Sequence, residues 1–235
     1  MMRLIIDIGN TLVKYAVFNN DKLLKLSKKN EVDHNYINQI ISENRVKSVI
    51  VSSVRKKIDW NISTKLVVLN HTTKLPITLN YKTPKTLGND RIANLVGASV
   101  FYPNKNTLVI DAGTCITFDF IDLNKVYHGG RISPGIEMRY RSLHEFTENL
   151  PKITSQTDDY FMGKSTKESI ISGVQQGVLS ELKLIISEIK KENEDLIVIV
   201  TGGDTFFFEK ALKNSIFADQ NFVLKGLNEI LKYNE

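Results

Sequence analysis

The hydrophobic positions in the first half of the chain follow two periods. Short, nearly continuous runs of Val, Ile and Leu alternate with tight polar turns, which is typical of buried strands. Two longer stretches place apolar residues three and four apart, the spacing of a helix with one buried face, and the first follows Asp33, a residue type that caps helices. We expect strands over residues 3–9, 12–18, 22–28, 46–54 and 65–69, helices over 34–45 and 89–101, and an irregular segment over 71–88.

The second half repeats this order of elements. Ser133 and Pro134 suit the N-cap and the first residue of a helix that we expect to reach residue 147. A stripe of apolar residues at helical spacing predicts a long helix over 165–191. The remaining elements are expected to be strands over 107–111, 115–121, 125–131 and 195–200, a loop over 149–164, and a helix, a short strand and a terminal helix after residue 204.

One phrase occurs twice along the chain. Residues 4–11 and 108–114 each consist of an apolar run, an Asp, a Gly and a hydroxyl side chain, and each leads into a second apolar run. A repeat at about half the chain length predicts two related halves, which we place at residues 1–104 and 105–235. Strands that alternate with helices, with three hairpin-joined strands opening each half, predict an α/β fold with mixed sheets flanked by helices.

Each copy of this phrase ends in a turn that suits phosphate. Glycine permits close approach of the backbone, so that amide N–H groups and a Thr hydroxyl can donate to phosphate oxygens. A carboxylate cannot bind phosphate directly, but Asp7 and Asp111 can hold a cation or its water shell. Two such turns facing each other across a cleft could hold a triphosphate. The alternative is that each is only a β-hairpin with an Asx turn.

The composition is typical of a globular protein. Apolar residues make up 42% of the chain and charged residues 24%, and no apolar run reaches the length of a membrane span. We see no signal peptide, and the chain has a single cysteine, Cys115, which we expect to be buried in a strand. Both features lead us to expect that the protein is located in a reducing cytoplasm. The four histidines share no ligand spacing. The net charge of +5 comes from scattered basic residues and favours an anionic small molecule over nucleic acid as the partner.

A Gly-Asn-Asp-Arg sequence at residues 88–91 begins the second predicted helix. An acidic residue there stabilises a helix N-terminus, so Asp90 has a structural interpretation as a partner of the helix dipole. The catalytic alternative makes Asp90 the general base of a kinase and Arg91 a clamp for an anionic substrate.

Three further glycine-containing segments lie next to predicted helices. Residues 129–135 (Gly-Gly-Arg-Ile-Ser-Pro-Gly) suit close approach of a ligand to the backbone or, alternatively, a bulged strand end. Residues 163–166 indicate a helix start whose amides and hydroxyls face the cleft. Gly202 and Gly203 offer a platform for a base or ribose, with a simple tight turn as the alternative.

Together these segments resemble the type III pantothenate kinases. The paired hairpins alone resemble the wider acetate and sugar kinase, Hsp70 and actin superfamily, whereas the Gly-x-Asp-Arg and Gly-Gly-x-Ile-x-Pro-Gly motifs are far more specific. Cys115 stands where the family pattern has Ala. The resemblance implies two ribonuclease H-like (actin-like ATPase) halves with a cleft between them. It rests on residues 7–11, 88–91, 111–114, 117, 119, 129–135 and 201–203, which follow that family's order and span nearly the whole chain.

The resemblance implies ATP-dependent phosphorylation of pantothenate to 4'-phosphopantothenate, the first step towards coenzyme A. It makes Asp90 the proton acceptor and Asp111 the ligand of a monovalent cation, K+ or NH4+, with Mg2+ accompanying ATP. It also implies a homodimer with the substrate close to the subunit interface. Pantothenate contacts are implied for Tyr81, Gly88, Asn89, Asp90, Arg91 and Thr166. ATP contacts are implied for Asp7, Ile8, Gly9, Asn10, Thr11, Leu12, Val13, Lys14 and Thr114, with the adenosine towards Gly202 and Gly203.

Two other functions are consistent with a nucleotide clamp of this kind. The family includes homologues described as accessory factors in transcription, so a non-catalytic nucleotide-binding regulator is the first alternative. Asp90 and Arg91 favour the enzyme, because a sensor has no need of a general base. The second alternative is a relative that hydrolyses ATP or polyphosphate and releases phosphate without pantothenate.

Overall fold

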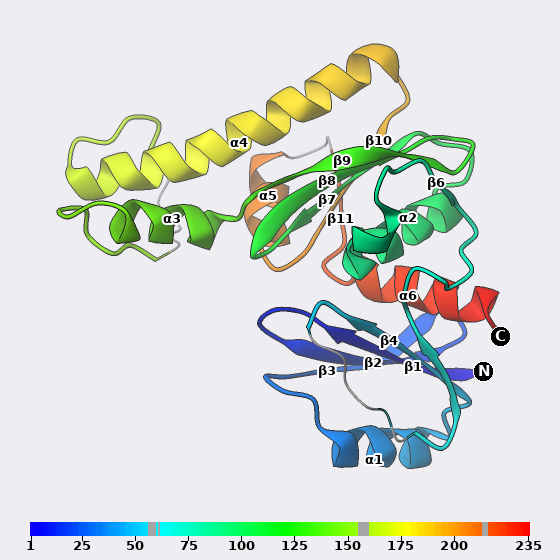
Figure 1. Ribbon diagram of the computed structural model, residues 1–235. Coiled ribbons are helices and arrows are strands. Elements are labelled where there is room, and N and C mark those ends of the chain that lie inside the picture. The colour runs from blue at the N-terminus through cyan, green and yellow to red at the C-terminus, as the bar shows by residue number, and fades with distance from the viewer. Residues whose placement is uncertain (56–59, 61, 155–159, 213–215) are drawn as a thin grey trace. The chain divides into compact units, whose positions relative to one another are not determined.

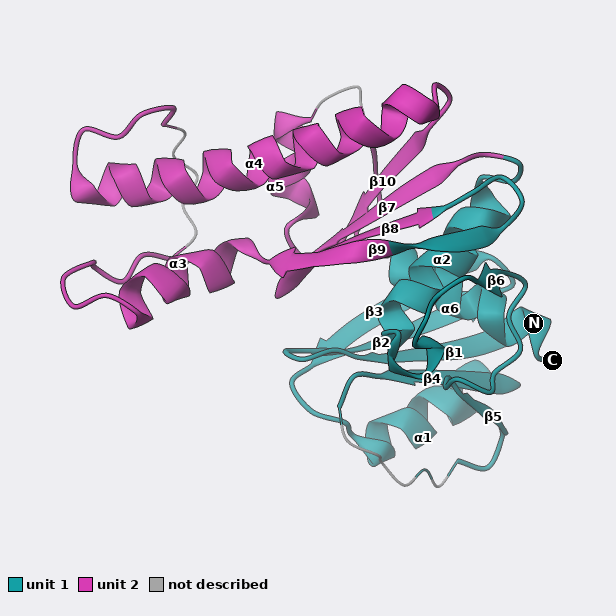
Figure 2. Cartoon of the chain, turned by 45° about the horizontal axis from the view of Figure 1, so that its top comes forward, with its two compact units in different colours: residues 1–104, 121–129, 221–235 teal, residues 105–120, 130–220 magenta. Residues whose placement is uncertain are grey.

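The chain forms two compact units in the computed structural model, which describes residues 1–55, 60, 62–154, 160–212 and 216–235 (Figure 2). Unit 1 contains residues 1–104, 121–129 and 221–235, and unit 2 contains residues 105–120 and 130–220. The terminal helix thus packs with the first residues of the chain. The halves expected at 1–104 and 105–235 stay a prediction, since units defined by packing and halves defined by a sequence repeat need not coincide.

Unit 1 is built on a mixed sheet whose strands are all short (Figure 1). The first two pairs along the chain are antiparallel, as a hairpin-joined meander requires, and the remaining strands run parallel to the first. The strand order is β3-β2-β1-β4-β5. The strands are β1 (Met2–Ile8), β2 (Val13–Asn19), β3 (Lys22–Lys29), β4 (Ser48–Ser53) and β5 (Lys65–Val68).

One face of this sheet is covered by α1 (His34–Asn44). The predicted cap is confirmed, because the Asp33 carboxylate accepts a hydrogen bond from the Tyr36 N–H at 2.9 Å. Ile37 and Ile40 are fully buried against the sheet, and Ile41 is partly buried beside them. The helix ends where Arg45 adopts a left-handed conformation with φ of 52°.

Two helices, α2 (Asn89–Phe101) and α6 (Phe222–Tyr233), pack against each other and contact β4 of the same sheet (Figure 1). Their crossing requires glycine. A Cβ atom on Gly226 would lie 1.9 Å from the Ala93 carbonyl oxygen, and one on Gly97 would lie 3.4 Å from the Gly226 Cα. The start of α2, which carries the Gly-Asn-Asp-Arg sequence, is therefore held by a tight helix–helix contact.

The second sheet has the strand order β11-β10-β7-β8-β9-β6, and its strands β8 and β9 pass from one unit into the other. β10 is parallel to both β7 and β11. A single-turn helix, η1 (Pro84–Thr86), follows β6. The strands are β6 (Thr78–Leu79), β7 (Thr107–Ala112), β8 (Cys115–Ile121), β9 (Val126–Pro134), β10 (Ile197–Thr201) and β11 (Phe217–Ala218).

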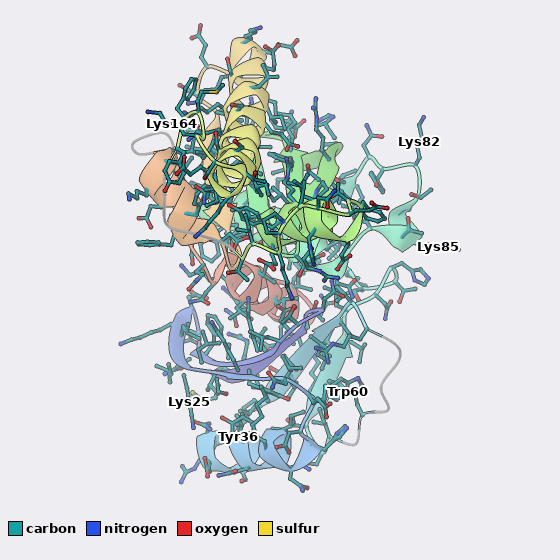
Figure 3. The ribbon with its side chains drawn as sticks, turned by 90° about the vertical axis from the view of Figure 1, so that its left-hand side faces the viewer. Lys25, Tyr36, Trp60, Lys82, Lys85 and Lys164 are labelled. Carbon is teal, nitrogen blue, oxygen red and sulfur yellow. The ribbon has the colours of Figure 1, made fainter. Side chains whose placement is uncertain are left out.

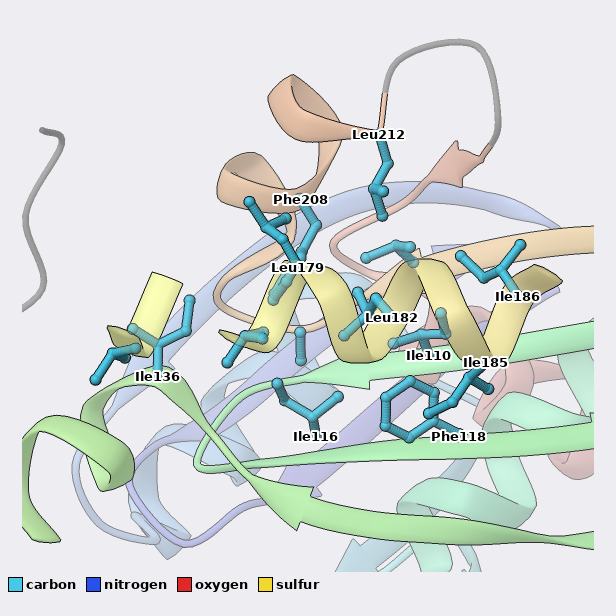
Figure 4. Close-up of a cluster of buried hydrophobic side chains, with 14 of the residues drawn as sticks. Ile110, Ile116, Phe118, Ile136, Leu179, Leu182, Ile185, Ile186, Phe208 and Leu212 are labelled. Carbon is cyan, nitrogen blue, oxygen red and sulfur yellow. The ribbon is translucent and has the colours of Figure 1, made fainter. Parts of the chain in front are cut away.

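The core of unit 2 lies between its strands and the long helix α4 (Thr166–Glu192), with α3 (Ile136–Glu145) and α5 (Thr205–Ala211) at its sides (Figure 4). The stripe predicted from the sequence is confirmed, because Val178 and Leu182 are fully buried in this core. The outer face of α4 carries Gly173 and Gly177, and no other group of the described residues lies within 4 Å of a Cβ built there.

Three sequence expectations are wrong in detail. The segment 71–88, expected to be irregular, contains the short strand β6 and the helix η1. β9 continues through Ser133 and Pro134, and Gly135 is the N-cap of α3, because the Arg139 side chain donates to Pro134 O at 2.9 Å and to Ser133 Oγ at 2.8 Å and so uses the groups expected to begin the helix. Cys115 opens β8 next to a turn and is partly exposed instead of buried. Residues 155–159 of the expected loop lie outside the described residues. No helix in the described ranges is long and apolar enough to cross a membrane.

Candidate functional site

The turn after β1 is the first copy of the repeated phrase. The Gly9 N–H donates to the Leu12 carbonyl at 3.0 Å and closes the turn between β1 and β2. The side chains of Ile8 and Val13 are fully buried in the core, so these two residues can offer a ligand only their backbone. Asn10, Thr11 and Leu12 are exposed, and they form the accessible part of the expected ATP loop.

A guanidinium group binds the outside of this turn. Arg55, two residues after β4, donates from Nε to the Gly9 carbonyl at 2.8 Å and from Nη2 to the Asn10 carbonyl at 3.2 Å. Both terminal nitrogens also lie 3.4 Å from the Asn30 carbonyl, just beyond β3. The turn is therefore tied to the two segments that flank it.

Asp7 is a buried carboxylate in β1 of unit 1. It lies opposite Ser52 in the parallel pairing of β1 with β4. Burial raises the pKa of Asp7 to about 6, the negative charge of Asp90 adds to this rise, and Lys14 and Ser52 oppose it. Within the described residues Asp7 forms no ion pair at salt-bridge distance. A buried carboxylate that has no ion pair at contact distance suits a divalent metal ion or its water shell, so the donor chemistry fits Mg2+.

The Gly-Asn-Asp-Arg sequence begins α2, with Gly88 as the N-cap. The Asn89 side chain donates to the Leu69 carbonyl at 3.0 Å and to the Ser53 carbonyl at 3.4 Å, which ties the helix start to the ends of β4 and β5. Asp90 Oδ1 accepts the Arg91 N–H at 2.8 Å. A Cβ on Gly88 would lie 2.4 Å from that oxygen, so the glycine makes room for the carboxylate.

Both interpretations of Asp90 find support in this geometry. Its contact with the Arg91 amide is what a dipole partner makes. Its negative charge also contributes to the raised pKa of Asp7, an effect that a dipole partner does not need. The other oxygen, Oδ2, has no hydrogen-bond donor among the residues described, which leaves it able to accept from a substrate hydroxyl.

Arg91 is buried, with 5% of its surface exposed. Its Nη2 donates to the Tyr127 hydroxyl at 2.9 Å. Tyr127, at the start of β9, is fully buried, and its ring lies 5.6 Å from the ring of Tyr81 at an interplanar angle of 35°. Two residues expected to contact pantothenate are thus linked through a third, Tyr127, which the sequence did not single out.

The second copy of the phrase lies in unit 2, where Asp111 in β7 stands opposite Thr201 of β10. The Gly113 N–H donates to the Cys115 carbonyl at 3.0 Å and closes the turn. Asp111 is half-buried and Thr114 is exposed.

Two glycines lie so close to the backbone of this second turn that a larger residue would not fit, which accounts for glycine at these positions of their motifs. A Cβ on Gly135 would lie 2.1 Å from the Gly113 carbonyl oxygen, and one on Gly202 would lie 2.3 Å from that of Ala112. Gly202 also has a φ of 96°, which favours glycine. Gly203 is exposed, with nothing within 4 Å of a Cβ position, so the surface expected to receive adenosine is open.

Thr166 is the first residue of α4 and is exposed. The Glu168 N–H donates to Ser165 Oγ at 3.3 Å, and the Lys164 N–H donates to the Glu168 carboxylate at 2.7 Å. The arrangement resembles a capping box, except that the Glu168 carboxylate accepts from Lys164 and not from the N-cap residue Ser165. The local sequence is therefore explained by helix initiation alone.

The predicted site residues fall into two groups. Unit 1 contains residues 7–14, Tyr81 and residues 88–91, whereas Asp111, Thr114, Thr166, Gly202 and Gly203 belong to unit 2. That both groups bind one nucleotide stays a prediction. Sequence reasoning missed Arg55 and Tyr127, and the only signal for either is position, since one follows β4 and the other begins the strand that leads into Gly129 and Gly130.

Comparison with known proteins gives the family. The family model described as type III pantothenate kinase matches residues 3–188. The type III pantothenate kinase of Christiangramia forsetii is 45% identical over 242 residues, which cover 100% of this chain and 99% of the relative.

Solved structures show the fold. A conserved protein of Campylobacter jejuni, proposed to be a Baf family transcriptional activator, has a TM-score of 0.61 and 22% identity and covers 98% of each chain. A ROK family glucokinase from Streptomyces griseus, solved with glucose and AMPPNP, has a TM-score of 0.54 and 12% identity and covers 99% of each chain. The α/β architecture with two helix-flanked sheets is thus that of the duplicated ribonuclease H-like fold, and by its sequence the chain belongs to the type III pantothenate kinase family.

Proposed function

We propose that this protein transfers the γ-phosphoryl group of ATP to the primary hydroxyl of pantothenate, giving 4'-phosphopantothenate and ADP. The family membership supports the reaction. The observation in the chain itself that carries the proposal is the position of Asp90 at the start of α2. The neighbouring Asn89 side chain donates to the carbonyl of Ser53, which pairs with Ile8 at the end of β1, beside Asp7 and the open glycine turn. A carboxylate next to a phosphate-binding turn is what a kinase needs to activate a hydroxyl.

Asp90 is the proton acceptor in this proposal. The pantothenate hydroxyl donates its proton to Asp90 Oδ2 while its oxygen forms the new bond to phosphorus, and the bond between phosphorus and the bridging oxygen breaks to release ADP. Little covalent chemistry falls to the protein, so positioning and charge stabilisation supply most of the rate. Arg91, Tyr81, Gly88, Asn89 and Thr166 are proposed to orient pantothenate.

The nucleotide-binding residues follow the two turns. We assign the triphosphate to residues 7–14 and Thr114, and the adenosine to Gly202 and Gly203. Asp7 would hold Mg2+ through its water shell, and the metal ion when bound neutralises phosphate charge. Asp111 is proposed to hold the monovalent cation, K+ or NH4+, and to reduce charge repulsion there.

Two further features belong to this proposal. We propose a homodimer, with pantothenate bound near the subunit interface, and a cytoplasmic location, which suits a pathway that starts from a soluble metabolite. Neither nucleic acid nor a membrane surface is expected as a partner, because the basic residues are scattered.

The regulator alternative is not favoured. Relatives that align with the whole chain are named as kinases. The likeness to a Baf family protein, at 22% identity, supports the fold alone. The two residues that a sensor would not need, Asp90 and Arg91, are both present.

A coupled assay of ADP release separates the three functions. The proposal expects ADP only when pantothenate is present, and a lower rate when sodium replaces potassium. ADP and phosphate released at equal rates with and without pantothenate would indicate a hydrolase. Nucleotide binding without ADP release under either condition would indicate the regulator.

A further inference from the structure

We propose that Arg55 is a positioning residue, which fixes the backbone amides of the turn at residues 9–12 in the orientation that binds the ATP phosphates. This proposal rests on the proposed function and goes beyond it, because no motif of the family resemblance includes Arg55. Arg55 follows β4, and its contact with the turn spans 46 residues of sequence.

The contacts define which face of the turn Arg55 occupies. Its guanidinium donates to the carbonyl oxygens of Gly9 at 2.8 Å and Asn10 at 3.2 Å. The Asn30 carbonyl accepts from both terminal nitrogens at 3.4 Å and holds the end of the guanidinium. Three carbonyls from two segments therefore converge on one planar cation, whose fork of donors matches such an arrangement.

The direction of these carbonyl groups also fixes the direction of the amide N–H groups that follow them. In a planar trans peptide the C=O and N–H bonds point in opposite directions. Because the Gly9 carbonyl points at Arg55, the N–H of Asn10 points away from it, and the Asn10 carbonyl orients the N–H of Thr11 in the same way. Arg55 thus directs two successive amides to the opposite side of the turn.

Those two amides are the ones available for a ligand. The Gly9 N–H is already used by the Leu12 carbonyl at 3.0 Å. The N–H groups of Asn10 and Thr11 have no protein acceptor in the described part of the chain, and both residues are exposed. Successive free amides with one orientation form an anion-binding concavity.

The backbone of Arg55 is also connected to the segment that is expected to bind pantothenate. Its own N–H donates to Ser53 Oγ at 3.1 Å, and the Ser53 carbonyl lies 3.4 Å from the Asn89 side-chain nitrogen at the start of α2. The end of β4 therefore connects the phosphate turn with the Gly-Asn-Asp-Arg sequence. This connection predicts that Arg55 affects nucleotide binding first and pantothenate binding less.

The test compares Arg55→Ala and Arg55→Lys with Lys25→Ala. Lys25 is an exposed cation of β3 in the same unit (Figure 3), so its variant removes one positive charge without touching the turn. Affinity for a non-hydrolysable ATP analogue is measured by calorimetry, KM for ATP and for pantothenate by steady-state kinetics, and folding by thermal unfolding.

We expect both Arg55 variants to bind the analogue about tenfold more weakly or worse, because misplaced donors lose most of their effect. KM for pantothenate should change less than KM for ATP in both Arg55 variants, and the affinity of Lys25→Ala for the analogue should stay at the wild-type value. Added methylguanidinium should partly restore nucleotide binding to Arg55→Ala, which a merely structural role would not predict.

Wild-type affinity in Arg55→Lys would mean that charge alone matters and would overturn the proposal, as would wild-type affinity in Arg55→Ala. If Arg55→Ala does not fold, the lysine variant decides the matter in the same way. A wild-type protein that binds the analogue but makes no 4'-phosphopantothenate would refute the proposed function and leave this comparison intact.

Discussion

At the scale of single residues, the candidate site contains a carboxylate, Asp7, whose ionised form is disfavoured by burial. Burial raises the pKa of Asp7 to about 6, and the negative charge of Asp90 adds to this rise, so both causes disfavour the carboxylate. The proposed function requires the ionised form, since a carboxylate attracts a metal ion far more strongly than a carboxylic acid does. The residue is therefore expected to reduce the stability of the fold in exchange for activity.

Replacing Asp7 by Asn tests this conflict. The raised pKa means that the folded state binds a proton more tightly than the unfolded chain, so stability is highest below about pH 4 and falls as pH rises through about 6. Asp7→Asn should therefore raise the free energy of unfolding by about 1–3 kcal/mol at pH 8 and abolish turnover. Urea unfolding at pH 8 and pH 4 in EDTA measures this.

The difference between Asp7→Asn and wild type should nearly vanish at pH 4. Asp195→Asn is the control, because Asp195 is an exposed carboxylate with 88% of its side-chain surface accessible. A variant at Asp7 that is less stable than wild type at pH 8 would contradict the assigned charge conflict.

Tyr127 is the second residue-scale test. Tyr127→Phe removes only the hydroxyl that accepts from buried Arg91 at 2.9 Å, and a buried cation that loses a hydrogen bond costs about 1–3 kcal/mol. KM for pantothenate should rise about tenfold, since Arg91 is the expected substrate clamp, while KM for ATP stays unchanged. Tyr233→Phe, at an exposed position, is the matched control. An unchanged KM for pantothenate would show that the Tyr127 hydroxyl does not contribute to substrate binding.

At the scale of elements, helix α2 is where packing and chemistry meet. Its N-terminus carries residues 88–91, and its middle is fixed against α6 by Ala93, Gly97 and Gly226. Since neighbouring parts of a rigid helix move together, the crossing sets the position of Asp90.

The glycine crossing makes a prediction with an internal control. A Cβ at Gly226 would lie 1.9 Å from Ala93 O, so Gly226→Ala should lower the free energy of unfolding by about 1–3 kcal/mol and reduce kcat. Gly173→Ala changes an exposed helix position with open space around it and should raise stability by about 0.5–1 kcal/mol. Chemical denaturation of both variants measures the contrast. Equal effects would mean that helix propensity, and not the crossing, governs Gly226.

At the scale of the whole molecule, the sequence predicts what depends on near neighbours. The Asp33 cap, the buried stripe of α4 and the two glycine turns all follow from residues close together in the chain. The start of α3 was predicted wrongly although its partners are near in sequence, because Arg139, which also binds Glu181 42 residues away, uses the groups of Ser133 and Pro134. Arg55 and Tyr127 could not be found either, since their roles depend on partners 46 and 36 residues away.

The repeated phrase guides the functional interpretation because it, too, depends only on residues close together in the chain. Asp7 and Asp111 each end a buried strand before a glycine turn, and this local chemistry is readable without tertiary structure. Which glycines are irreplaceable is not readable, because Gly135 and Gly202 are needed for backbone atoms that lie elsewhere in the sequence.

The turnover of Asp90→Asn decides whether Asp90 is the general base. If Asp90 accepts the proton from pantothenate, kcat should fall by about 10²–10⁴, with affinity for an ATP analogue and thermal stability close to wild type. Formation of 4'-phosphopantothenate, followed by mass spectrometry, gives the rate. A variant that makes this product at the wild-type rate would contradict the assignment of Asp90 as the base and, with it, the account of how this site works.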